Sequence, residues 1–111
     1  EKVAALVPLA DNIAHLDLAR TAITDAALAT VAKFPRLAKL DLRNTKITDA
    51  GLEPLTALKK LHSINLFGTA ITDNGLNSLK AIASLKIAYA AGTKVTPAAA
   101  AGIKKPFIVV K

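Results

Sequence analysis

The chain contains no Cys, no Met and no Trp, and aromatic residues make up only 4% of its 111 residues. Without Cys it can form no disulfide, no thiolate metal site and no thiol nucleophile. Hydrophobic residues nevertheless reach 52%, so the interior has to be built from Leu, Ile, Val and Ala. A chain of this length fits one ordinary domain and not two. We therefore expect a single domain with an aliphatic core.

Long hydrophobic runs are also missing. No stretch approaches the roughly 18 consecutive apolar residues of a membrane span, because Lys, Asp or Asn interrupts the apolar residues every few positions. We expect a soluble chain that does not insert into a membrane. The chain begins with Glu1 and lacks Met, which favours a mature or excised segment whose targeting signal lies outside it.

Acidic residues are absent after Asp73, whereas Lys residues continue to the end of the chain. The net charge of +7 and the pI near 9.9 would suit nucleic acid, anionic lipid or acidic protein partners. However, the lysines are spaced out, and few aromatic side chains lie among them to stack on bases. The pattern favours a solvated basic surface and disfavours a nucleic-acid platform.

The most prominent feature of the sequence is a set of four similar segments, RTAITDAAL, NTKITDAGL, GTAITDNGL and GTKVTPAAA. The first Thr of each segment recurs every 24 residues, at Thr21, Thr45, Thr69 and Thr93. A fixed period of this size indicates a stacked repeat architecture. Before each Thr, apolar residues alternate with other residues, as in LDL and INL, which predicts a short strand with one buried face. The apolar columns hold Ile13, Leu37, Leu61 and Leu85, then Leu16, Leu40, Ile64 and Ala88, then Leu18, Leu42, Leu66 and Ala90.

The second half of each repeat predicts a short helix or 3₁₀ segment, because apolar residues recur there at three-residue steps. These residues are Leu28, Val31 and Phe34, then Leu52, Leu55 and Leu58, then Leu76, Leu79 and Ile82. Thr24, Thr48 and Thr72 each precede an Asp, which predicts an N-cap followed by an acid at the positive end of the helix. Pro54 predicts that the second helix is bent or begins later.

The pattern LxxLxLxxTxITDxGLxxLxxL, carried in full by residues 37–58 and 61–82, resembles the leucine-rich repeat, in its bacterial variety with Thr where many repeats have Asn or Cys. The resemblance implies an α/β right-handed solenoid, with a parallel β-sheet on the concave face and short helices on the convex face. It also implies binding without catalysis and without a cofactor. We expect one domain over 1–111, with a partial leading unit at 1–12, full repeats at 13–36, 37–60 and 61–84, and a degenerate repeat with a C-terminal cap at 85–111.

The fourth repeat departs from the pattern, because Ala88, Ala90 and Ala100 replace large residues. We expect Phe107 or a neighbour to fill the space, and residues 107–110 to form one last strand. Counting by the period places Val109 in the column of Leu85.

Strand residues between the Leu positions face the open side of the sheet, and these positions are the candidate partner-binding site. The site comprises His15, Asp17, Lys39, Asp41, Arg43, Asn65, Phe67 and Tyr89. Asp17 and Asp41 fall on neighbouring strands about 4.8 Å apart, with His15 on the same face. They could share a cation, or Lys39 and Arg43 could neutralise them in an ordinary charged ladder; we assign no metal.

Phe67 and Tyr89 are the second candidate, because exposed aromatics beside an Arg are typical of a binding hot spot. Alternatively, the C-terminal segment could cover both rings. The four aligned Thr hydroxyls predict bonds to the backbone of adjacent turns, not chemistry. No GxSxG turn and no phosphate-cradling Gly motif is present, so we expect no enzyme.

Two functions remain open from the sequence. The first is a non-catalytic module that binds a protein partner through the concave face. The second is a structural or spacer repeat domain of a larger secreted or haem-domain-containing protein. The resemblance slightly favours a secreted or periplasmic location, and the open ends of the stack favour weak self-association.

Overall fold

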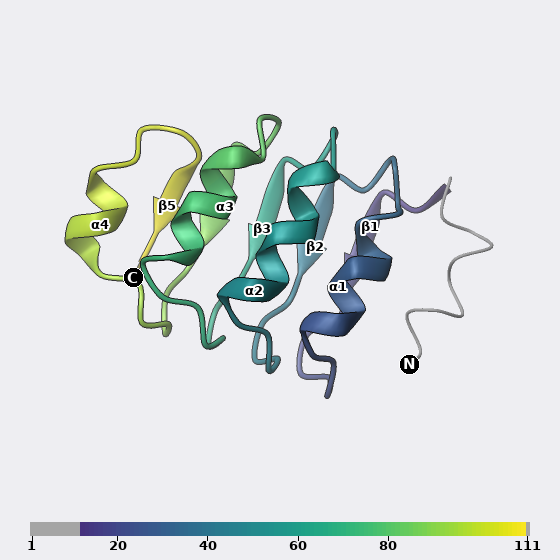
Figure 1. The fold of residues 1–111 in the computed structure, drawn as a ribbon, viewed down its shortest axis with the longest axis horizontal. Helices are drawn as coiled ribbons and strands as arrows, with labels where there is room; N and C mark the ends of the chain where they lie inside the picture. Colours follow the sequence, from purple (N-terminus) through teal and green to yellow (C-terminus); the bar gives the residue numbers. More distant parts are fainter. Residues whose placement is uncertain (1–11, 111) are drawn as a thin grey trace.

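A computed structural model describes residues 12–110 and shows one sheet of five parallel strands. The strands follow one another in chain order across the sheet (Figure 1). They are β1 (His15–Asp17), β2 (Lys39–Asp41), β3 (Ser63–Asn65), β4 (Ile87–Tyr89) and β5 (Phe107–Val109). The expected leading unit, residues 1–12, lies outside the described residues except for Asn12.

The helices all cover the same face of the sheet and leave the other face open (Figure 1). They are α1 (Asp25–Val31), α2 (Asp49–Leu52) with η2 (Glu53–Ala57), α3 (Gly75–Ala81) and α4 (Pro97–Ala101). In the second repeat the α-helix gives way to 3₁₀ geometry, and Pro54 lies in the first turn of that 3₁₀ segment. The second helix does not begin later, because α2 begins at Asp49, the position equivalent to Asp25 in α1; it changes from α to 3₁₀ geometry next to Pro54.

The core lies between the sheet and the helices and consists of the predicted apolar columns. The strand register places Leu40 between Leu16 and Ile64, so equivalent side chains stack from one repeat to the next. On the helical side, Leu28, Val31 and Phe34 are fully buried. Both periodicities therefore predicted the correct inward face, and the α/β solenoid predicted from the sequence is confirmed.

The Thr column that marks the period is part of the scaffold, as predicted. The Thr45 and Thr69 hydroxyls are buried and donate to the carbonyl oxygens of Leu42 and Leu66, both at 2.8 Å. The equivalent hydroxyls of Thr21 and Thr93 make the same bond three residues back along the chain. Each bond satisfies polar groups at the turn that leaves a strand.

The second Thr column differs from its prediction. Thr24 and Thr48 precede helices but make no side-chain cap, whereas the Thr96 hydroxyl accepts the N–H of Ala99 at 3.2 Å. The Thr72 hydroxyl accepts the N–H of Asn74, the residue before α3, at 3.3 Å. Thr48 instead donates its backbone N–H and its hydroxyl to the Asp25 carboxylate of the preceding repeat, at 2.7 and 2.5 Å.

This arrangement recurs along the stack, and we call it the Asp–Thr bridge. Asp49 accepts in the same way from Thr72, and Asp73 from Thr96. All three Asp residues therefore bind the next repeat, and Asp25 and Asp49 also lie in the first turn of their own helices, whereas α3 begins two residues after Asp73.

The end of the sheet also corrects the prediction. The last strand exists, but Phe107 pairs with Ile87, so the final step along the sheet takes 20 residues where the earlier steps take 24. Val109 consequently lies opposite Tyr89 on the open face, and not in the column of Leu85. Phe107 is 64% exposed and does not fill the thin layer; its neighbour Ile108 joins the core.

Candidate functional site

The open face of the sheet carries two columns of side chains, which follow the register expected from the sequence over the first four strands. One column holds His15, Lys39, Ser63, Ile87 and Phe107, and the other holds Asp17, Asp41, Asn65, Tyr89 and Val109. Both columns change from charged or polar residues at β1 and β2 to apolar residues at β4 and β5. The face therefore has a polar half and an apolar half.

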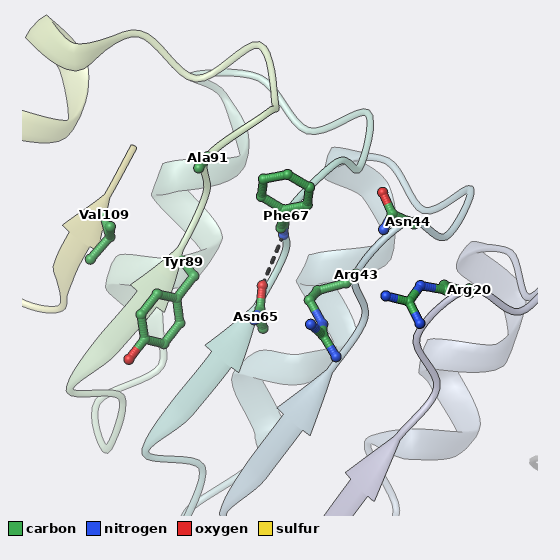
Figure 2. Close-up of a pocket in the computed structure, with 8 residues that line it drawn as sticks. All are labelled: Arg20, Arg43, Asn44, Asn65, Phe67, Tyr89, Ala91 and Val109. Atoms are coloured by element: carbon green, nitrogen blue, oxygen red, sulfur yellow. Dashed lines mark hydrogen bonds between the residues drawn. The ribbon is translucent and has the colours of Figure 1, made fainter. Parts of the chain in front are cut away.

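The polar members of the second column are tied to their own turns. Asp17 accepts the backbone N–H of Ala19 at 3.0 Å, and Asn65 accepts that of Phe67 at 3.1 Å (Figure 2). Asp41 does the same for Arg43 at 3.1 Å. These side chains are held toward the ends of their strands, and they help to shape the turns that follow.

The charged ladder proposed for this face is present in part. The Arg43 Nε donates to both oxygens of Asp41 at 3.0 Å, whereas Lys39 forms no ion pair within residues 12–110. His15 and Asp17 do not join a third acidic or His ligand, and the described part of the chain gathers no group of three potential metal ligands. Arg43 uses only Nε in its ion pair, so its two terminal nitrogens remain free of hydrogen bonds to described residues.

The turns that leave the first four strands share a left-handed residue at equivalent positions. These residues are Arg20, Asn44, Gly68 and Gly92, with φ of 60°, 56°, 71° and 72°. Gly and Asn are the usual occupants of this conformation, because other side chains strain it. Arg20 is the exception.

A cavity of about 330 Å³ opens on the open face at the ends of the strands, where these turns begin. Figure 2 shows the side chains that line it, which come from the turns after β1 to β4 and from strands β3, β4 and β5. They are Arg20, Arg43, Asn44, Asn65, Phe67, Tyr89, Ala91 and Val109. Its size is at the lower end of the range for ligand sites.

The sequence predicted half of this lining. Arg43, Asn65, Phe67 and Tyr89 come together as expected, whereas His15, Asp17 and Lys39 lie on the polar half and do not line the cavity. Arg20 and Asn44 were not predicted because they lie one residue beyond the alternating positions of each strand, and Val109 was not predicted because of the shortened last step. Their shared 24-residue spacing with Gly68 and Gly92 was a signal that could have identified the two turn residues.

The two aromatic rings are accessible. Phe67 is 45% exposed and Tyr89 39% exposed, although β5 and Val109 lie directly beside Tyr89. The alternative in which the C-terminal segment covers both rings is therefore wrong for the residues that the structure describes. A Cβ at Gly92 would lie 3.4 Å from Cε2 of Phe67, so the ring packs over the turn of the next repeat.

No helix within residues 12–110 is long and apolar enough to cross a bilayer. A search of curated proteins found no match for this chain. The family model described as Leucine Rich repeat matches residues 37–55 and 57–80, which include β2, α2 and β3 and most of α3. With this match and with parallel strands alternating with short helices in a single sheet, the chain is a leucine-rich repeat protein.

Proposed function

We propose that the chain is a non-catalytic module that binds a protein partner through the open face of its sheet. Leucine-rich repeats generally mediate protein–protein interaction. The observation that carries the proposal is the pair of exposed rings, Phe67 and Tyr89, beside the Arg43 guanidinium on a face that no helix covers. Aromatic and Arg side chains supply most of the binding energy at protein interfaces.

The dimensions of the face indicate a modest interface. Neighbouring strands are about 4.8 Å apart, so five strands span about 20 Å. A standard interface covers roughly 800 Å² on each partner. The strands here are three residues long, so the partner must also contact the turns at the strand ends, where the cavity lies.

The proposal is tested by affinity capture from an extract of the source organism, with proteins quantified by mass spectrometry. The test variant replaces both rings, Phe67→Ala with Tyr89→Ala. The matched control replaces two exposed side chains of the helical side, Lys33→Ala with Lys80→Ala. Circular dichroism checks that both variants keep the fold.

A partner of the open face is enriched by the wild-type chain and by the control, and is lost by the ring variant. Equal recovery with the wild-type chain and the ring variant would contradict the proposal. Loss of capture with only the lysine variant would place the interaction on the helical side.

A further inference from the structure

The cavity beside the two rings carries uncompensated positive charge. Its lining contains two guanidinium groups and no acidic residue. Asp41 lies next to the cavity and pairs with Nε of Arg43, but Arg20 forms no ion pair with any described residue. Figure 2 shows the Arg20 side chain extending from its turn toward Asn44 and Arg43. An anionic group in the cavity would pair with the Arg20 guanidinium and with the terminal nitrogens that Arg43 leaves free of described partners.

We infer that this cavity binds a carboxylate side chain of the partner together with an aromatic side chain that neighbours it in the same segment. The inference rests on the proposed function and names the chemistry of the partner. Guanidinium groups suit carboxylates, because their parallel N–H donors match the two oxygens. The rings of Phe67 and Tyr89 provide the apolar contact on the other side of the cavity.

The volume limits what the cavity can take. About 330 Å³ holds little more than one side chain and the charged group beside it, so a folded surface cannot enter deeply. An acidic segment that presents its aromatic residue in extended form fits this volume. The chain's net charge of +7 favours the approach of such a segment over long range.

The backbone at Arg20 supports a role for its side chain. Its φ of 60° lies in the left-handed region, where the equivalent positions of later repeats have Gly68 and Gly92. A non-Gly residue in this region is strained, and strained backbone conformations occur more often at functional sites than elsewhere. Here the strained residue is also the free cation of the cavity.

The same face argues against a nucleic-acid strand as the occupant. Asp17 and Asp41 lie on adjacent strands of the open face, so a phosphate backbone running across it would meet their carboxylates. The positive charge of the cavity comes from Arg20 and Arg43 alone, which suits a single carboxylate better than a row of phosphates.

The experiment uses blocked peptides and the full chain. The probe is acetyl-Gly-Asp-Phe-Asp-Gly-amide, titrated into ¹⁵N-labelled protein and followed by NMR. One comparison peptide replaces both Asp with Asn, and another replaces the Phe with Ala. We expect the probe to shift the amide resonances of Phe67, Gly68 and Gly92, and each comparison peptide to bind about tenfold more weakly.

Protein variants locate the charge that matters. Arg20→Gln should lower the affinity for the probe about tenfold, as expected for the loss of one charge-assisted contact. It should leave the affinity for the Asn peptide unchanged. Arg36→Gln is the matched control, because Arg36 is exposed and outside the cavity lining. Arg20→Gly should lower the affinity for the probe without lowering the free energy of unfolding, which separates loss of binding from unfolding.

The inference is overturned if the probe does not bind, if the Asn peptide binds as tightly, or if Arg20→Gln and Arg36→Gln have the same effect. It is also overturned if a short single-stranded oligonucleotide binds this cavity more tightly than the probe at the same salt concentration. These outcomes do not depend on partner capture. A partner that is lost with the ring variant while the peptides show no preference for charge would leave the proposed function standing and remove only this inference.

Discussion

The Asp49 carboxylate accepts two hydrogen bonds from Thr72 of the next repeat, one from the backbone N–H at 2.8 Å and one from the hydroxyl at 2.5 Å. Both bonds connect the segment just before α3 to the first residue of α2. In a repeat protein, stability depends on the interfaces between neighbouring repeats. The Asp–Thr bridge is a recurring polar component of those interfaces, alongside the Leu columns.

Asp49→Ala should lower the free energy of unfolding by about 1–3 kcal/mol, because it leaves the Thr72 N–H and hydroxyl without their charged acceptor. Urea unfolding followed by circular dichroism measures the change. Glu53→Ala is the matched control, since Glu53 is an exposed acid in the next turn whose carboxylate accepts no hydrogen bond from a described residue. Equal losses for the two variants would show that the bridge contributes nothing specific.

Gly51→Ala should destabilise the protein by about 1–3 kcal/mol, although Ala is the better helix former. A Cβ at Gly51 would lie 2.9 Å from Cδ1 of Leu28 and would also meet the Asp25 carboxylate of the bridge. The ITDxG motif therefore pairs an Asp in one repeat with a Gly that makes room for it in the next.

Gly102→Ala is the control for this steric argument. Its φ is −75°, and the atom nearest to its added Cβ would be 3.5 Å away. Thermal unfolding should show a change of less than about 1 kcal/mol, in the stabilising direction. A stabilised Gly51→Ala variant would contradict the account of the motif.

Arg20→Gly should raise the free energy of unfolding by up to about 1 kcal/mol, because Gly relieves the left-handed strain but gains freedom in the unfolded state. Ala22→Gly is the comparison, because Ala22 is exposed, lies two residues away and has no positive φ. This variant should lower the free energy of unfolding by about 0.5 kcal/mol. Differential scanning calorimetry of both variants gives the comparison. Destabilisation by Arg20→Gly would contradict the expected relief of strain and would show that the Arg20 side chain contributes to folding.

The edge of the sheet at β5 should support weak self-association. β5 is the last strand of the described sheet, so one side of its backbone is unpaired, and Phe107 beside it is 64% exposed. Sedimentation velocity should show a mean mass that rises with concentration, and Phe107→Lys should reduce the rise by adding charge at the edge. A constant monomer mass at all concentrations would contradict this expectation.

The sequence predicted the solenoid well because its columns repeat. Leu28, Leu40 and Leu42 lie in rows that recur every 24 residues, and a side chain that must be buried in every repeat leaves a clear periodic signal. The buried faces, the parallel register and the role of the Thr45 hydroxyl all followed from that period. The candidate residues Arg43, Asn65, Phe67 and Tyr89 followed from the positions that the period leaves free.

Other features could not be predicted from the period alone. The bond from Thr48 to Asp25 connects different repeats, whereas the sequence suggested an equally reasonable cap within one repeat. The apolar run after Pro106 fits a strand in either register, and only packing decides that Ile108 and not Phe107 faces the core. The cavity depends on where turn side chains such as Arg20 are directed, which the strand pattern does not specify.

The most direct test of the central claim is hydrogen–deuterium exchange on the protein with and without a captured partner. Binding through the open face predicts slower exchange at residues 65–68 and 89–92, which surround the two rings, and no change over α2 and η2. Protection confined to α2 and η2, with unchanged exchange beside Phe67 and Tyr89, would contradict the account.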